Sequence, residues 1–215
     1  MPERYPIPAA AARAEIEVKR SRFIATAAPA FTVEEARAFI ARIKQEFSDA
    51  THNVPAFVIG HGTAVTAHCN DDGEPAGTAG RPVLNVLRGS GLGDAALVVT
   101  RYYGGTKLGT GGLARAYGDA AKAVLDILPR AERVPVHTIL LTIPYNYLER
   151  IRLLVEKRRG RILEEEFAAD IAITAQFPTQ QFAAFQNDLR ELSHGSLAAE
   201  IIETNDAILP VIRDA

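Results

Sequence analysis

The chain has 215 residues and carries 24 lysine and arginine against 26 aspartate and glutamate side chains, a formal charge of −2 at pH 7. This length suits one large or two small domains, and 47% hydrophobic with 23% charged residues argues against a disordered chain. The single cysteine, Cys69, excludes a disulfide within the chain. The first ten residues lack the apolar core of a secretory signal, and no apolar run reaches the ~18–20 residues of a transmembrane helix. These features predict a soluble, cytoplasmic protein.

The charge is nearly balanced along the chain as well as in total. Residues 1–128 carry 14 basic and 13 acidic side chains, and residues 129–215 carry 10 and 13. This balance argues against a globally basic nucleic-acid binder and leaves only a local basic patch open. Glycine is distributed unevenly, because 12 of the 16 glycines lie between Gly73 and Gly118. Backbone freedom is therefore concentrated in one fifth of the chain.

The first half of the chain predicts a mixture of strands and helices. Thr32 and Glu35 form a capping box, and apolar residues follow at helical spacing up to Phe47. Short apolar runs separated by glycine-rich segments predict strands. The predicted elements are two strands within 14–28, a helix over 32–47, a strand over 55–60, a short helix over 82–87, a strand over 95–103 and a helix over 113–128.

The second half predicts a separate domain with the order βαββαβ. Residues 129–133 are charged and bracketed by proline, so a linker is expected there, between domains at 1–128 and 134–215. The order is typical of a ferredoxin-like fold, in which two helices cover one face of an antiparallel sheet. The predicted elements are strands over 136–143, 161–167, 170–177 and 197–203 and helices over 145–159 and 179–194.

The segment 101–117 (RYYGGTKLGTGGLARAY) predicts a strand that leads through a glycine loop, 104–112, into a helix. Such a helix N-terminus offers unpaired N–H groups to a phosphate or carboxylate, and Arg101, Lys107 and Arg115 could add positive charge. Neither the Walker nor the Rossmann glycine pattern is present. A tight structural turn, in which the glycines only satisfy backbone geometry, is the alternative.

Three carboxylates, Asp71, Asp72 and Glu74, lie in a loop with Gly73. They could bind Mg²⁺ or supply a general base, and the alternative is a structural role in turns and capping. His52, His61, His68, Cys69 and Asp71 match no zinc spacing, so no metal is predicted. Adjacent strand residues point to opposite faces, which also argues against a catalytic pair of His68 and Cys69.

Two motifs together go beyond generic pattern: NDDGEPAGTAGRPVL at 70–84 and VVTRYYGGTKLGTGGLARAY at 98–117. They resemble the YigZ/IMPACT family, and KRSRFIA at 19–25 is similar to that family's N-terminal segment. His52 lies where the family's strand-entry histidine falls. The sequence departs from the family pattern at Asn70, where serine is more usual, and at Asn53 and Val54, where histidine or cysteine is common.

The resemblance implies an α+β protein with two domains. The first would be similar to the second domain of a small-subunit ribosomal protein, and the second to the ferredoxin-like domain of elongation factor G. Bacterial members look like nucleic-acid- or ribosome-associated proteins. Eukaryotic relatives carry an added domain and modulate the starvation-response kinase pathway in translation.

The leading functional hypothesis is a non-enzymatic RNA- or ribosome-associated protein linked to translation or its regulation. A protein-interaction module acting through the DDGEP and RYYGG segments, and a phosphate-binding protein or enzyme, are the alternatives. No cofactor is predicted, and the oligomeric state stays open. The three carboxylates form one part of the candidate site. The candidate anion- or RNA-binding residues are Arg22, Arg101, Tyr103, Gly104, Gly105, Lys107, Gly111, Gly112 and Arg115. Lys19, Arg20 and Tyr102 could add to the same surface.

Overall fold

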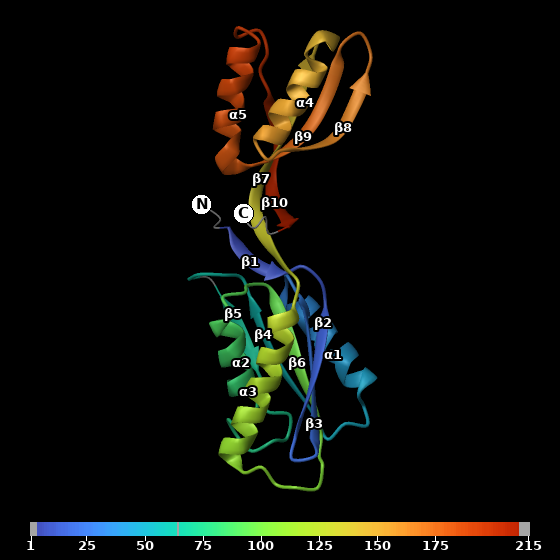
Figure 1. The fold of residues 1–215 in the computed structure, drawn as a ribbon, viewed down its shortest axis with the longest axis vertical. Helices are drawn as coiled ribbons and strands as arrows, with labels where there is room; N and C mark the ends of the chain where they lie inside the picture. The colour runs from blue at the N-terminus through green and yellow to red at the C-terminus, as the bar shows by residue number, and fades with distance from the viewer. Residues whose placement is uncertain (1–3, 64, 211–215) are drawn as a thin grey trace. The chain divides into compact units, whose positions relative to one another are not determined.

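The computed structural model describes residues 4–63 and 65–210, and the chain divides into two compact units between Glu132 and Arg133 (Figure 1). This division falls within residues 129–133, where the sequence predicted a linker, and the strand β7 begins in the same segment, at Arg130. Ala131 within this segment is 2% exposed and Val134, just after it, is 7% exposed, so their side chains are packed. Within the described residues, no helix is long and apolar enough to cross a membrane.

The N-terminal unit is built on a five-stranded antiparallel sheet with the order β2-β3-β6-β4-β5. Its central strand is β6, whose neighbours are β3 and β4 (Figure 1). The sequence did not reveal the short strands β1 and β5. The elements are β1 Tyr5–Pro8, β2 Ala12–Val18, β3 Ser21–Pro29, α1 Val33–Glu46, β4 His52–Ile59, β5 Thr66–Cys69, α2 Gly80–Gly89, β6 Ala95–Tyr102 and α3 Thr110–Ile127.

The two faces of this sheet carry different helices. Phe23, Val54 and Leu97 point to the face covered by α2 and α3, where they meet the fully buried Tyr117. Phe57 belongs to the opposite face, which packs against α1. This division follows from the period of two in a strand, which sends successive side chains to opposite faces.

The helix α1 begins where the sequence predicted. The Glu35 backbone N–H donates to Thr32 Oγ1 at 3.1 Å. The Glu35 carboxylate accepts in turn from the backbone N–H of Phe31 at 2.8 Å, one residue before the expected partner. Thr32 thus satisfies one donor of the helix N-terminus, and Glu35 binds the residue that precedes the cap.

The helix α3 begins earlier than predicted, at Thr110. The Leu113 N–H donates to the carbonyl of Gly109 at 2.9 Å, so Gly111 and Gly112 belong to the first helical turn rather than to the loop. Glycine is a weak helix former, and its low helix propensity is why the sequence predicted a loop up to residue 112. Packing of Leu113 and Tyr117 against the sheet outweighs it.

The second five-stranded sheet has the order β1-β7-β9-β8, and β10 also pairs with β7. Its strands from the C-terminal unit therefore follow the order β10-β7-β9-β8, with β7 and β8 both antiparallel to β9. This order confirms the predicted ferredoxin-like arrangement, in which α4 and α5 supply Ile151 and Phe185 to the core of the unit. The elements are β7 Arg130–Ile143, a 3₁₀ turn at Tyr145–Tyr147, α4 Leu148–Lys157, β8 Arg161–Phe167, β9 Ile171–Pro178, α5 Thr179–Leu192 and β10 Glu200–Pro210.

Gly104 lies against the turn that joins β2 to β3. A Cβ atom at this position would stand 2.0 Å from the carbonyl oxygen of Arg20, whereas a Cβ at Gly111 would meet no atom within 4 Å. The Gly104 N–H also donates to Ser21 Oγ at 3.1 Å. A Cβ there would push two backbone segments apart, because the nearest atoms that it would meet, in Arg20 and Ser21, all belong to the backbone.

We therefore expect Gly104→Ala to lower the free energy of unfolding by about 3 kcal/mol, the upper part of the usual range for overpacking. Gly111→Ala should leave it unchanged or raise it by up to ~1 kcal/mol, because alanine is the better helix former. Urea unfolding of both variants measures the difference. Equal stability of the two variants would contradict the assignment of Gly104 to packing.

Candidate functional site

The two glycine-containing motifs meet in one cleft of about 520 Å³ in the N-terminal unit. One wall comes from the loop that follows β5, a second from the end of β6 and the segment leading into α3, and a third from the start of β4. The exposed surface of the cleft is mostly apolar, although six of its eleven lining residues are polar or charged. The lining residues are Thr51, His52, Glu74, Pro75, Arg101, Tyr103, Lys107, Leu108, Gly109, Thr110 and Leu113.

A buried carboxylate joins the walls of this cleft. Glu74 Oε1 accepts hydrogen bonds from Arg101 Nη1 at 2.5 Å and from the Tyr117 hydroxyl at 2.8 Å. The side chains of Glu74 and Arg101 are only 4% and 6% exposed. Burial, followed by the neighbouring Glu74 charge, raises the pKa of Tyr117, so the phenol stays protonated and acts as a donor. The charge of Arg101 is thus compensated inside the protein.

Arg101 also lies between two aromatic rings. Its guanidinium carbon is 5.5 Å from the ring centre of Phe23 and 5.4 Å from that of Tyr103. Arg101 Nε is buried and has no hydrogen-bond partner among the described residues. Tyr103 is 46% exposed, and its backbone N–H is held by Thr51 Oγ1 at 3.0 Å. The Tyr103 ring is therefore fixed in place, while part of its surface remains open to a ligand.

The hydrogen bonds of His52 determine which of its ring nitrogens is free. Nδ1 lies 2.7 Å from the carbonyl oxygen of Asp72, which can only accept, so Nδ1 carries the proton. In the neutral ring, Nε2 is then an acceptor, and it lies 3.8 Å from Glu74 Oε1. Because Glu74 Oε1 already accepts from Arg101 and Tyr117, the acceptor left for a ligand at this wall is His52 Nε2, which suits a ligand that brings a hydroxyl or an amino group.

The other two carboxylates of the acidic loop have structural partners. Asp71 accepts from the backbone N–H groups of Gly77, Ala79 and Gly80 at 2.8, 3.1 and 2.8 Å. Partial burial acts to raise the pKa of Asp71, but these three bonds outweigh it and hold the pKa below its usual value. Asp71 therefore holds the loop closed and caps the N-terminus of α2.

Asp72 connects the acidic loop to α1 and β4. Its Oδ2 accepts from the backbone N–H of Asn53 at 2.7 Å, and its Oδ1 pairs with the Lys44 ammonium. Burial acts to raise the pKa of Asp72, and the Lys44 and Asn53 bonds hold it below its usual value. Across the described residues, no three His, Cys, Asp or Glu side chains are grouped to hold a metal ion. The three carboxylates point to three different partners.

A cationic turn lies beside the cleft. Lys19 and Arg20 connect the paired residues Val18 and Ser21, and both have positive φ, 49° and 65°. Arg20 Nη2 donates to Thr106 Oγ1 at 3.0 Å, which places the turn next to the loop that carries Lys107. Two consecutive side chains in the left-handed region are unusual without glycine or asparagine, and such conformations concentrate at functional sites. We call residues 19–20 the hairpin tip.

The structure brings together only part of the set that the sequence proposed. Glu74, Arg101, Tyr103 and Lys107 line the cleft, and Arg22 instead forms an exposed pair with Glu15 at 2.8 Å. Tyr102 is bound to Asp49 at 2.8 Å rather than facing the cleft. The residues of the set that do not line the cleft are Arg22, Asp71, Asp72, Gly104, Gly105, Gly111, Gly112 and Arg115.

Several lining residues were missed or given another role by the sequence analysis. The sequence analysis gave His52 only a possible metal-binding role and a match to the family's strand-entry histidine, and it did not include Thr51 or Leu113 among the candidate site residues. Pro75 and Leu108 lay within the DDGEP segment and the glycine loop but received no role of their own. In the structure, His52 begins a strand whose register places it opposite Arg101. That register is a tertiary fact, so the proximity could not be read from residues separated by 49 positions.

We expect Glu74→Ala to lower the free energy of unfolding by about 3–5 kcal/mol, because it leaves the Arg101 charge buried without its carboxylate. The double variant Glu74→Leu with Arg101→Met should lose less than Glu74→Ala, because it removes both charges. Urea unfolding at pH 7 measures both. If Glu74→Ala lowers the free energy of unfolding by less than ~1 kcal/mol, water solvates Arg101 in place of the lost carboxylate, which would contradict the prediction.

Comparison with known proteins agrees with this two-unit organisation. Residues 19–125 match the Impact N-terminal domain family, and residues 141–196 match a domain of unknown function, DUF1949. A crystal structure of a protein described as hypothetical shares 39% sequence identity and a TM-score of 0.62, covering 94% of this chain and 98% of that one.

Two bacterial proteins are similar over nearly the whole chain. An IMPACT family member of Haemophilus influenzae is 40% identical over 203 residues, which cover 94% of this chain and 98% of that protein. The IMPACT family member YigZ of Escherichia coli is 39% identical over 202 residues, covering 94% and 99%. The paired motifs at 70–84 and 98–117 that form the cleft lie within the matched domain. The chain therefore belongs to the IMPACT family.

Proposed function

We propose that this protein binds single-stranded RNA, free or within the ribosome, and acts without catalysis in translation or its regulation. The observation that carries the proposal is Tyr103, a half-exposed aromatic ring that stacks on the buried Arg101 at a cleft beside Lys107. Proteins that bind single-stranded nucleic acid combine such stacking rings with nearby cations. The family resemblance implies the same class of partner.

The arrangement of Tyr103 supports binding to an unpaired base. The Arg101 guanidinium covers one side of the ring and is itself fixed by Glu74, so the ring is positioned before a ligand arrives. Stacking of one base on an aromatic side chain is worth about 1–3 kcal/mol by alanine substitution. A preorganised ring retains more of that energy, since less side-chain freedom is lost on binding.

The positive charge available to phosphate groups is local. Arg101 is compensated by Glu74, and Arg22 by Glu15. Lys107 forms no ion pair within the described residues, and the hairpin tip beside it adds Lys19 and Arg20. A few cations beside one stacking ring suit a short single strand better than a duplex, which needs an extended basic surface.

The free ring nitrogen of His52 favours RNA over DNA. With Nδ1 committed to the Asp72 carbonyl, the neutral ring presents Nε2 as an acceptor beside the Glu74 carboxylate. The ribose 2′-hydroxyl is a donor that DNA lacks. A 2′-hydroxyl bound at this wall of the cleft can donate its single proton to His52 Nε2, because Glu74 Oε1 already accepts from Arg101 and Tyr117.

We expect Tyr103→Ala to weaken binding of a single-stranded RNA dodecamer by about 10–100-fold, with an unchanged salt dependence. Lys107→Ala should weaken binding and make the slope of log K against log salt shallower by about 0.7. Fluorescence anisotropy at several salt concentrations measures both effects. Lys122→Ala, an exposed lysine farther along α3, and Tyr145→Ala, an exposed tyrosine of the C-terminal unit, are the matched controls.

Two results would overturn the proposal. One is the absence of binding at low salt to both the RNA dodecamer and intact ribosomes. The other is equal weakening by Tyr103→Ala and Tyr145→Ala, which would place the contact outside the cleft. A preference for DNA of the same sequence would remove the role assigned to His52.

We further expect the double variant Lys19→Asn with Arg20→Gly to be more stable than the natural chain and to bind RNA more weakly. Asparagine followed by glycine is the favoured pair for a two-residue hairpin turn in the left-handed region, so the gain should be about 1 kcal/mol. Urea unfolding and the same anisotropy assay measure the two effects. Increased stability with unchanged RNA affinity would show that the hairpin tip does not contact the ligand.

A further inference from the structure

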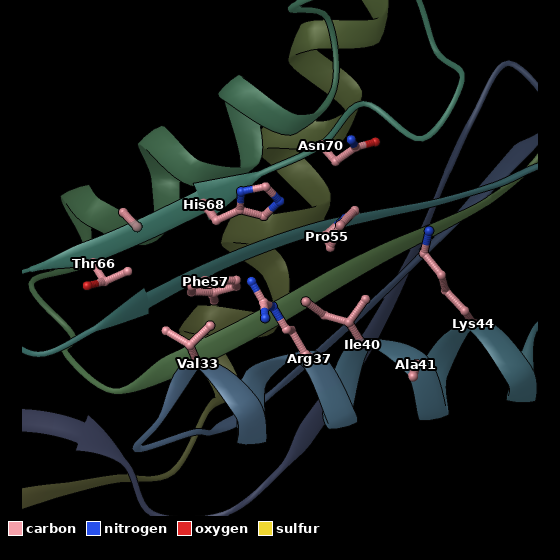
Figure 2. Close-up of a pocket in the computed structure, with 11 residues that line it drawn as sticks. Val33, Arg37, Ile40, Ala41, Lys44, Pro55, Phe57, Thr66, His68 and Asn70 are labelled. Atoms are coloured by element: carbon pink, nitrogen blue, oxygen red, sulfur yellow. The ribbon is translucent and has the colours of Figure 1, made fainter.

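A second hollow lies on the other face of the N-terminal sheet, between α1 and the edge strand β5. It has a volume of about 500 Å³, and Figure 2 shows side chains of α1, β4 and β5 that point into it. It exists because α1 packs over the inner strands while β5 extends the sheet one strand farther. We call it the α1–β5 groove. Its walls include Arg37 and Lys44 from α1 and His68 from β5.

The floor of the α1–β5 groove is apolar. Ile40 and Val33 are partly buried and pack against the core cluster that contains Phe57. The Phe57 ring is only 3% exposed, and the His68 ring covers it with 5.4 Å between the ring centres. An apolar floor of this kind takes an aliphatic side chain. It offers no open aromatic face of the kind that a nucleotide base stacks on.

The charge of the groove has one sign. None of its eleven lining residues is a carboxylate, whereas Arg37 and Lys44 are cations. The Lys44 ammonium pairs with Asp72, but Arg37 is exposed and has no ion pair within the part of the chain that the structure describes. A guanidinium above an apolar floor favours a partner that brings a carboxylate.

The edge of the sheet supplies the remaining contact. Within the described sheet, β5 ends the strand order and pairs with β4 on one side. The Asn70 N–H donates to the carbonyl of Pro55 at 3.2 Å, and hydrogen-bonded pairs alternate along an antiparallel ladder. His68 is therefore the next residue bonded to β4, and the N–H and C=O of Ala67 point to the free edge. The strand carries no proline and no lysine to block pairing.

We propose that the α1–β5 groove binds an extended acidic segment of a partner protein, which adds a strand to the free edge of β5. One aliphatic side chain of the segment fills the floor above Ile40 and Phe57, and a neighbouring carboxylate pairs with Arg37. This mode is β-augmentation, in which main-chain bonds give affinity and alternate side chains give specificity. The site lies on the face opposite the cleft and does not depend on RNA binding.

The test is selection of a displayed library of random octapeptides on the full chain. The natural chain should select peptides in which Asp or Glu alternates with Val, Ile or Leu. Arg37→Glu should instead select Lys or Arg and bind the original peptides at least ~10-fold more weakly, since it reverses the charge that they meet. Arg42→Glu, an exposed arginine of the same helix that does not line the groove, should select as the natural chain does.

Amide hydrogen exchange with a selected peptide then tests the strand addition. The Ala67 amide should exchange at least ~10-fold more slowly in the complex, while the His68 amide, already paired to β4, should change little. Selection of no peptides, or of peptides without acidic residues, overturns the proposal. Protection elsewhere, equal binding to polyglutamate, displacement by RNA, or self-association through β5 in place of peptide binding also overturns it.

Discussion

The carboxylate of Glu74 is the group on which the candidate site depends. It belongs to the loop after β5, yet it accepts from Arg101 on β6 and from Tyr117 on α3. One buried oxygen therefore holds three separate segments of the chain at the same place. The cleft is the space that these segments leave between them, so its walls keep their spacing only while the carboxylate stays paired.

A buried ion pair of this kind is a weak source of net stability, because removing both charges from water offsets most of their attraction. Its consequence here is geometric. Fixing the Arg101 guanidinium fixes the Tyr103 ring that stacks on it, and the hydroxyl of Thr51 holds the same residue by its backbone. Burial of the ion pair therefore adds little net stability, but it holds an aromatic surface in a fixed position at the mouth of the cleft.

The antiparallel sheet of the N-terminal unit separates two surfaces of different chemistry. Side chains that face α2 and α3 include Phe23 and lead to the cleft, and side chains that face α1 include Phe57 and form the floor of the α1–β5 groove. His68 and Cys69 show the division at one step of a strand, because His68 lines the groove while Cys69 packs against the opposite core. One strand can therefore contribute to both faces of the sheet with different side chains.

The sequence by itself determined most of the helices and strands, and the order βαββαβ along the chain of the C-terminal unit. Periodicity and capping residues act over a few positions, which is why the helix after Thr32 and the βαββαβ order were predictable. Short-range signals failed at β1 and β5, which are four residues long and have little pattern of their own. They failed again at the start of α3, where packing of Leu113 and Tyr117 outweighs the poor helix propensity of two glycines.

The two motifs that make up the cleft were identifiable from sequence, but their roles were not. Asp71, Asp72 and Glu74 carry the same functional group within four positions. Nothing in the local sequence shows that Asp71 caps α2, that Asp72 connects the loop to α1 and β4, or that Glu74 forms a buried ion pair. Those roles depend on which groups lie opposite in space, and the nearest partners are separated by up to 43 residues along the chain. Tertiary structure alone made that choice, because a carboxylate's function is set by the charges and donors around it rather than by its neighbours in sequence.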